Sequence, residues 1–239
     1  LTEYFSIISI INRPDSCHSC RAIDSVVFKS VFWIESLDLR AKSLMLEQSP
    51  FYYLLKELAI DLHWSWNHAT DKIWRQLDPV LWELTHNPFV VLQTVSQQRI
   101  TELMKDPIAF DLVNELVEAK RQRSLAPAWF QHHHPQSRLT QVAYFSMEFM
   151  LSEALPIYSG GLGNVAGDHL KTASDLGVPV VGIGLFFQQG YSRQVIYKNG
   201  DQRYVTPYND PGQLPVEPLR DASGEWVRLE VKLPGHSVW

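Results

Sequence analysis

Three glycines in the segment Ser159-Gly160-Gly161-Leu162-Gly163-Asn164 could bring a ligand against the protein backbone. Glycine has no Cβ, so it tolerates both unusual backbone angles and the close approach of a ligand. A helix is predicted to begin near Asn164, and the unpaired N–H groups at the start of a helix attract anions. The segment therefore predicts a phosphate site. Glycines that only permit close packing in a tight turn would give the same pattern, so both interpretations stay open.

Two better-known glycine-rich sites fit the segment poorly. The residues from Gly161 to Ala166 match the loose G-x-G-x-x-G/A dinucleotide pattern, but in that fold the glycines follow directly from a strand, and here residues 148–159 intervene. That fold also places an acidic residue about 20 positions later, whereas residues 177–199 contain no Asp or Glu. A nucleotide P-loop is excluded because no Gly-Lys-Ser/Thr follows the glycines.

The candidate metal and redox residues form incomplete sets. Cys17 and Cys20 are the two cysteines of the chain, and a C-x-x-C pair without a second ligand pair favours reduced thiols. Residues 132–134 (HHH) are adjacent, cannot all face one ion, and are predicted to be a linker. His63 and His68 are five positions apart instead of the four of a helical zinc site. We therefore expect no metal site.

The glycine segment lies inside a predicted strand–helix–strand unit. Residues 142–147 are a continuous apolar run of the length of a buried strand, and residues 178–185 are a second such run. A helix is predicted between them at 164–176, with Gly177 as its C-cap. This order of elements is that of a right-handed parallel βαβ unit.

The two ends of the chain do not belong to this strand–helix–strand unit. Further strands are predicted at 191–197 and 226–233, the latter from its alternation of apolar and polar residues. The chain then ends at Trp239, before any element that could complete a doubly wound sheet, so we expect a truncated sheet. Residues 1–45 show no sustained period and are expected to be a poorly ordered extension.

A helical region is predicted between the extension and the sheet, over residues 46–135. Apolar residues at helical spacing begin after Ser49-Pro50, which suit a cap and a first turn. Three more capping residues precede prolines and predict further helix starts: Asp78, Asn87 and Asp106. Helices are expected at about 70–76, 79–84, 88–105 and 107–123, with a core filled by Trp64, Trp66, Trp74 and Trp82.

Composition sets the broad class. The 239 residues are 45% hydrophobic and 20% charged, which is typical of a globular protein. The net charge of −5 gives no reason to expect nucleic acid or an anionic membrane as a partner. The apolar runs at residues 7–11 and 26–34 are far shorter than the ~20 residues of a membrane-spanning helix. We expect a cytoplasmic protein.

The sequence resembles the short bacterial and archaeal α-glucan phosphorylases. The matching motifs lie in and after the predicted strand: YFSMEF at 144–149, LPIYSGGLG at 155–163, AGDHLK at 166–171, ASDLG at 173–177 and QGY at 189–191. Earlier motifs resemble the helical region of those enzymes: LKELA at 55–59, WSWN at 64–67 and LDPxxW at 77–82. The resemblance covers about residues 50–239 and identifies the chain as an N-terminal fragment of such an enzyme.

The resemblance implies a fold and an activity. The fold is α/β: a helical N-terminal region, then an incomplete Rossmann-like parallel sheet over residues 136–239, the N-terminal half of a two-domain glycosyltransferase. The family cleaves α-1,4-glucan with inorganic phosphate to give glucose 1-phosphate, with pyridoxal phosphate held by a lysine, and the full enzyme is expected to be a homo-oligomer. That lysine and the cationic side chains that hold the phosphates belong to later parts of such enzymes, so this chain is expected to be inactive alone and unable to bind the cofactor covalently.

The resemblance also implies roles for single residues, although no residue is assigned a catalytic step. Gly160 and Gly161 would offer backbone N–H groups to the substrate phosphate, and Leu162 would line the glucose subsite. Asn164 would support the pocket through the helix that it opens. Glu148 would lie near the pocket floor, or instead pair with a buried arginine.

Two other functions stay open. The chain could be a non-catalytic module that binds glucan or a partner chain. It could also be part of a nucleotide-sugar glycogen synthase, which also places a Gly-Gly-Leu-Gly turn before a helix. Those enzymes carry a lysine two residues before the first glycine, where this chain has Tyr158, which argues against that assignment.

Overall fold

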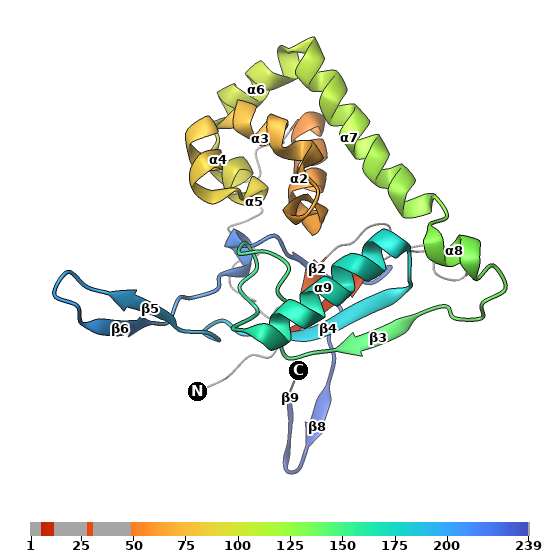
Figure 1. The fold of residues 1–239 in the computed structure, drawn as a ribbon, viewed down its shortest axis with the longest axis vertical. Coiled ribbons are helices and arrows are strands. Elements are labelled where there is room, and N and C mark those ends of the chain that lie inside the picture. The colour runs from red at the N-terminus through yellow and green to blue at the C-terminus, as the bar shows by residue number, and fades with distance from the viewer. Residues whose placement is uncertain (1–5, 12–27, 31–48, 239) are drawn as a thin grey trace.

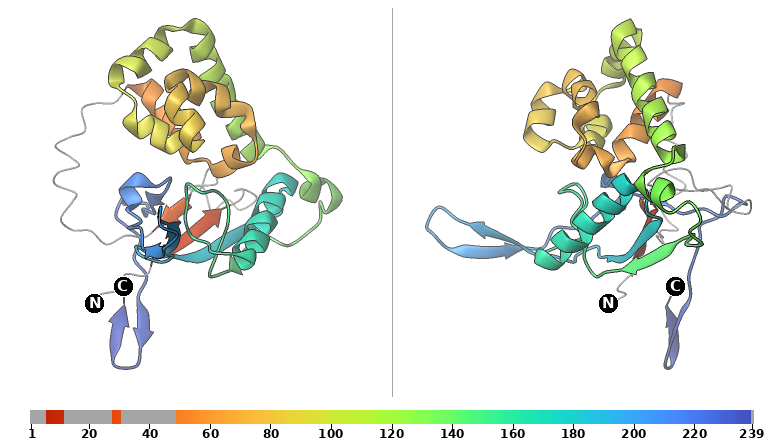
Figure 2. Two further views of the ribbon diagram at one scale, coloured as in Figure 1. Left: turned by 60° about the vertical axis from the view of Figure 1, so that its left-hand side comes forward. Right: turned by 45° about the vertical axis from the view of Figure 1, so that its right-hand side comes forward.

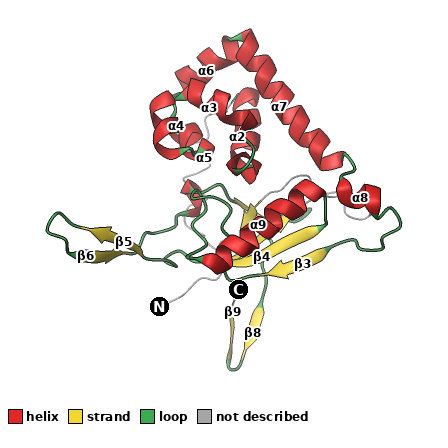
Figure 3. Ribbon diagram, viewed as in Figure 1, coloured by secondary structure: helices red, strands yellow, loops and turns green. Residues whose placement is uncertain are grey.

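The computed structural model describes residues 6–11, 28–30 and 49–238, and it is a mixed α/β structure in which helices precede a small sheet (Figure 1). Colouring by secondary structure shows helices α2 to α7 gathered on one side and the sheet with α9 on the other (Figure 3). This arrangement confirms the predicted fold class of a helical region followed by an α/β unit.

The helical region consists of short helices whose starts follow the predicted caps. Its elements are α2 (Pro50–Ile60), η1 (Leu62–Ser65), η2 (His68–Thr70), α3 (Asp71–Leu77), α4 (Pro79–Thr85), α5 (Pro88–Thr94), α6 (Gln97–Lys105), α7 (Pro107–Leu125) and α8 (Trp129–His133). Ser49, Asp78, Asn87 and Asp106 each accept a backbone N–H from the first turn of the helix that follows them. A proline occupies the first turn of each of these helices, where its missing N–H has no intrahelical partner to lose.

The predictions for this region need three corrections. The single helix expected at 88–105 is two helices, because the chain leaves the helical conformation at Val95 and Ser96 caps a new start. Trp64, Trp74 and Trp82 are buried as predicted, but Trp66 is half-buried and faces the sheet unit. The predicted linker at 132–134 is largely the end of the short helix α8.

The main sheet has the strand order β3-β4-β1-β2-β7. Its strands are β1 (Ser6–Ile11), β2 (Phe28–Ser30), β3 (Val142–Phe145), β4 (Val180–Phe186) and β7 (Glu217–Pro218). β3 and β4 run parallel with Val142 opposite Val180, and α9 (Gly161–Leu176) connects them, so the predicted βαβ unit is present. Gly177 ends α9 with a φ of 69°, as expected of a C-cap glycine.

Two differences concern the sheet. β3 was expected to be a buried strand, but it forms the edge of the sheet and most of its residues are exposed. The amino-terminal extension supplies two strands: β1 pairs antiparallel with β4, and β2 pairs with β1. The sheet is therefore mixed, with a parallel βαβ unit at one edge.

Two hairpins project from the body of the molecule (Figure 2). β5 (Arg193–Ile196) pairs with β6 (Gln202–Val205), in agreement with the strand predicted at 191–197. The strand predicted at 226–233 shortens to β8 (Val231–Leu233), which pairs with β9 (His236–Val238). In the sequence, η3 (Pro211–Gln213) comes between the two hairpins.

The helical region and the sheet unit are joined by a shared core and by polar contacts. Leu62 and Trp64 belong to the same buried cluster as Phe149, Leu155 and Leu170. The remaining helices pack around a second cluster that includes Trp74 and Trp82. Polar links add to the shared core: Ser65 Oγ donates to Leu151 O at 2.9 Å, Trp66 Nε1 to Asp175 Oδ1 at 3.1 Å and Gln131 Nε2 to Gly177 O at 2.8 Å.

Candidate anion site at the N-terminus of helix α9

Helix α9 begins within the glycine segment. Its first residue is Gly161, three positions before the predicted start at Asn164, and Gly160 is the N-cap with extended backbone angles. The first helical bond runs from Asn164 N–H to Gly160 O at 3.2 Å. The glycines therefore form the first turn itself, where backbone N–H groups have no intrahelical acceptor and carry partial positive charge.

The glycines of this segment have two different kinds of surroundings. A Cβ on Gly163 would lie 2.7 Å from the Cβ of Tyr158, and one on Gly167 would lie 1.9 Å from the carbonyl oxygen of Met150. Close packing explains these two glycines. By contrast, a Cβ on Gly160 or Gly161 would have no described atom within 4 Å. Neither packing nor a positive φ explains glycine at those two positions.

The carboxylate of Glu148 already binds one side of the turn. It accepts hydrogen bonds from Ser159 N at 3.0 Å, Ser159 Oγ at 2.7 Å and Gly160 N at 3.3 Å. The hydroxyl and backbone N–H of Ser159, with smaller contributions from the N–H groups of Gly160 and Gly163, hold the pKa of Glu148 below its ordinary value. Glu148 thus lies next to the predicted phosphate donors, and within the described part of the chain its carboxylate binds the turn and no arginine.

These contacts determine which backbone N–H groups of the turn remain available to a ligand. Gly160 N–H, one of the two predicted phosphate donors, points to Glu148, whereas Gly161 begins the helix. Leu162, predicted to line a glucose subsite, is 60% exposed, and Val165 one turn along is 69% exposed. Asn164 is exposed as well, and its backbone N–H closes the first turn. The five predicted residues therefore lie together at one end of α9.

The quoted motifs contain Tyr158 and Tyr191 but did not predict the contacts that these tyrosines make with acidic residues near the turn. Tyr158 donates a hydrogen bond to Glu153, and burial followed by this bond raises the pKa of Tyr158 to about 12. Burial, and then the charge of Glu148, raises the pKa of Tyr191. Arg193 Nη2 lies 3.9 Å from Glu153 Oε2. The contacts of Tyr191 and Arg193 join separate segments of the chain, so spacing along the chain does not reveal them.

The structure can be compared with the prediction of no metal site only over the described residues. Among the residues that the structure describes, no group of three or more His, Cys, Asp or Glu side chains could hold a metal ion. Cys17 and Cys20 lie outside the described residues. None of the described helices has the length and apolar character needed to cross a membrane.

Comparison with known proteins identifies relatives of the chain. Residues 53–155 match a family model described as "Protein of unknown function (DUF3417)". The glycogen phosphorylase of Mycobacterium tuberculosis is 40% identical over 190 residues, which cover 77% of this chain and 22% of that protein. The maltodextrin phosphorylase of Thermococcus litoralis is 40% identical over 189 residues, with the same two coverages.

A third relative agrees with these two. The glycogen phosphorylase of Aquifex aeolicus is 32% identical over 188 residues, which cover 77% of this chain and 26% of that protein. No solved structure gives a significant match. The chain spans about a fifth to a quarter of the length of these relatives. Over the residues that it shares with them, about three quarters of its length, the chain is similar to glycogen and maltodextrin phosphorylases.

Proposed function

We propose that the chain supplies the phosphate-binding turn of an α-glucan phosphorylase, which releases glucose 1-phosphate from α-1,4-glucan with inorganic phosphate. The observation that carries this proposal is the open space at Gly160 and Gly161. Packing explains Gly163 and Gly167, so the same explanation would be expected to hold for all four glycines if the turn were purely structural. Glycine at 160 and 161 instead suits the close approach of a ligand to the backbone.

We infer distinct roles for the residues of this turn. Gly161 N–H and the start of α9 attract the substrate phosphate. Glu148 is a positioning residue, because its carboxylate binds Ser159 and Gly160 and fixes the approach to the helix. Exposed Leu162 contributes an apolar edge to the glucose subsite. Asn164 acts through its backbone N–H, which closes the first turn on Gly160.

The cofactor is a property of the longer enzymes. In the family that the sequence resembles, pyridoxal phosphate is held by a lysine in a later part of the chain and supplies a second phosphate group to the reaction. The described residues fit the substrate-phosphate side of such a site, and two carboxylates beside the turn, Glu148 and Glu153, disfavour a second anion there. Homo-oligomeric assembly and a cytoplasmic location complete the proposal.

The test is a titration of the full chain with inorganic phosphate, in which NMR records the backbone amide signals of the turn. Gly161→Pro removes one N–H donor, and proline suits the first position of a helix. We expect phosphate affinity to fall about 10- to 100-fold, since a hydrogen bond to a charged group contributes about 1.5–3 kcal/mol. Gln97→Pro, at the first position of α6, is the matched control and should leave phosphate binding unchanged.

Two results would contradict the proposal. One is an absence of phosphate-induced shifts at residues 160–164 in the wild-type chain. The other is equal loss of binding in Gly161→Pro and Gln97→Pro, which would show that a proline at any helix start disturbs the fold and that the turn has no special part.

A further inference from the structure

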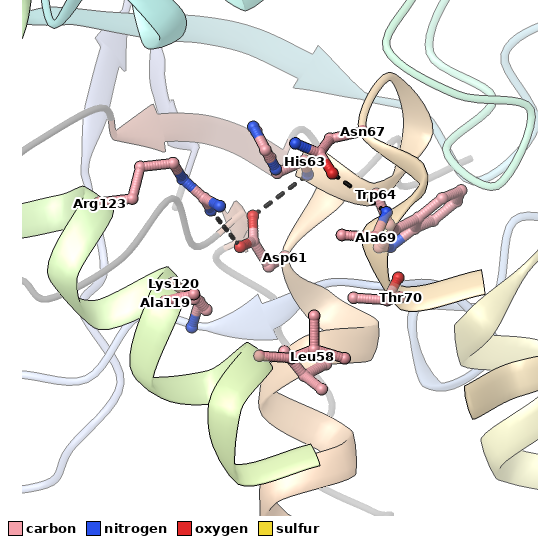
Figure 4. Close-up of a pocket in the computed structure, with 11 residues that line it drawn as sticks. Leu58, Asp61, His63, Trp64, Asn67, Ala69, Thr70, Ala119, Lys120 and Arg123 are labelled. Atoms are coloured by element: carbon pink, nitrogen blue, oxygen red, sulfur yellow. Dashed lines mark hydrogen bonds and ion pairs between the residues drawn. The ribbon is translucent and has the colours of Figure 1, made fainter. Parts of the chain in front are cut away.

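A cavity of about 130 Å³ lies inside the helical region, between α2, η1, η2 and α7 (Figure 4). Its polar lining comes from Asp61, His63, Asn67, Thr70, Lys120 and Arg123, and its apolar wall includes Leu58 and Trp64. In the close-up, Asp61 lies between the Arg123 side of α7 and the His63 backbone. This site is separate from the α9 turn, because the part of α9 that approaches His63 is Asp175, near the opposite end of that helix.

Thr70 has an unmet hydrogen-bonding requirement in this lining. Its Oγ1 is buried and has no hydrogen-bond partner among the described residues. Thr70 is the N-cap of α3, where a hydroxyl ordinarily accepts a backbone N–H, yet it makes no such bond. Buried polar atoms in proteins are nearly always paired, and a polar group that enters the cavity would pair this hydroxyl.

The charged side chains around the cavity are paired with groups of opposite sign. Arg123 Nη2 binds Asp61 Oδ2 at 2.7 Å, and Asp61 Oδ1 accepts His63 N–H at 3.1 Å. Lys120 Nζ binds Glu57 Oε1 at 3.1 Å. The side chains of Asp61 and Lys120 are only 7% and 8% exposed. A ligand with a net charge would meet an opposing group of its own sign here, so the lining favours an uncharged one.

The lining combines hydrogen-bond acceptors, donors and an apolar wall. A carboxylate, an amide and a hydroxyl can accept, while the guanidinium, ammonium, amide and hydroxyl can donate. A purely apolar molecule would leave Thr70 unpaired. The volume is close to the ~150 Å³ of a cavity that holds benzene, so the cavity has room for one edge of a hydroxylated ring. A ring that carries hydroxyl groups satisfies each of these conditions.

We propose that this cavity binds the hydroxyl-bearing edge of one uncharged sugar ring. The binding is independent of the anion site on α9 and requires no phosphate. The hydroxyl of Thr70 pairs with a sugar hydroxyl, Asp61 and Arg123 fix the orientation of the ring, and Leu58 and Trp64 cover its apolar face.

The experiment titrates the full chain with D-glucose and, in a separate arm, with inorganic phosphate, and follows backbone and indole N–H signals. We expect glucose to shift the signals of Asn67, Thr70 and Trp64, and phosphate to leave them in place. Thr70→Val keeps the shape but removes the hydroxyl, so glucose affinity should fall about tenfold. Thr101→Val, on the exposed face of α6, makes the same chemical change and should leave the affinity unaltered.

A second variant tests the cavity in case Thr70→Val does not fold. Ala119 lines the cavity from the exposed side of α7, so Ala119→Leu fills the entrance and keeps a strong helix former. It should abolish the glucose-induced shifts. The proposal is overturned if glucose leaves the cavity signals unchanged, if phosphate shifts them in its place, or if folded Thr70→Val and Ala119→Leu both bind glucose as well as the wild type.

Discussion

Gly161 and Gly167 lie on the same helix and respond oppositely to an added methyl group. A Cβ on Gly167 would lie 1.9 Å from the backbone oxygen of Met150, which cannot move aside as a flexible side chain can. Gly167→Ala should therefore lower the free energy of unfolding by about 1–3 kcal/mol or more. Gly161→Ala has open space and a helical position, so stability should stay equal or rise by up to about 1 kcal/mol. Chemical denaturation of both variants measures the contrast, and equal stabilities would refute this account of the turn.

Glu148 ties the stability of the turn to pH. Its hydrogen bonds from Ser159, and then from backbone N–H groups, lower its pKa below the 4.5 of a free side chain. A carboxyl with a lowered folded-state pKa stabilises the fold above the unfolded pKa, and this contribution disappears as the pH falls through the folded value. Glu148→Gln should therefore be less stable than wild type at neutral pH, and the gap should narrow below about pH 4.5.

The measurement is the free energy of unfolding of both proteins between neutral and acidic pH. Glu102 lies on α6 and also has a lowered pKa, so Glu102→Gln serves as a control that leaves the turn intact. Only the Glu148 variant should alter phosphate binding to residues 160–164. A gap between Glu148→Gln and wild type that stays constant with pH would show that the carboxylate does not hold the turn.

At the scale of helices and strands, the capping residues give the clearest prediction. Asn87 Oδ1 accepts the N–H groups of Phe89 and Val90 at the start of α5. Asn87→Ala should lower the free energy of unfolding by about 1 kcal/mol. Asn114 is the matched control, since it lies within α7 and binds the carbonyl oxygen of Phe110. Asn114→Ala should be neutral or stabilising, because alanine is the better residue in a helix interior. Thermal unfolding of the two variants tests the difference; an Asn114→Ala loss as large as that of Asn87→Ala would contradict it.

The same local signals explain which elements were predictable from the sequence. Asp78, Asn87 and Asp106 each precede a proline, and both the cap and the first turn depend on neighbours within three residues. Gly177 likewise marks the end of α9 through its own backbone angle. The parallel β3–α9–β4 unit followed from two apolar runs on either side of a helical stretch.

The errors arise where distant contacts decide. An apolar run at 142–147 predicts a buried strand, but β3 lies at the edge because it pairs with β4 on one side and with no described strand on the other. Trp66 resembles the other core tryptophans in spacing, yet its indole reaches Asp175 on α9. In the candidate site, the glycines were recognisable, whereas the bonds from Glu148 to Ser159 and Gly160 depend on a loop that folds back over eleven residues.

At the scale of the whole molecule, His63 lies where the helical region meets the sheet unit. Asp61 and Arg123 face it from the helical region, and its Nε2 lies 3.8 Å from Asp175 Oδ1 on α9, where Lys171 also covers Trp66. Burial, followed by the charge of Arg123, lowers the pKa of His63 below 6.5, although both carboxylates oppose the shift. The folded chain therefore favours neutral His63, so stability should fall as the pH drops below about 6.5.

His63→Gln should remove this part of the pH dependence. The relevant quantity is the difference in unfolding free energy between His63→Gln and wild type at pH 5 to 8, because it isolates the contribution of His63. Asp175→Asn should lower the pKa of His63 further, since one opposing carboxylate is lost. A titration of the His63 ring signals by NMR measures that shift. A rise in the pKa of His63 in Asp175→Asn would overturn this description of the contact between the two regions.

The activity expected of the chain by itself depends on which parts of the proposed phosphate site it contains. In the proposed function the turn attracts an anion and is flanked by Glu148 and Glu153, and phosphorolysis brings two phosphate groups together, which requires cationic side chains to offset their repulsion. The resemblance places those side chains and the cofactor lysine in later parts of the family's enzymes, and the chain spans about a fifth to a quarter of its relatives. We therefore expect the 239-residue chain, assayed with glucan, phosphate and added pyridoxal phosphate, to bind phosphate weakly and to form no glucose 1-phosphate. Steady production of glucose 1-phosphate would show that this turn needs no further part of the enzyme, and phosphate binding without turnover would support the division of the site.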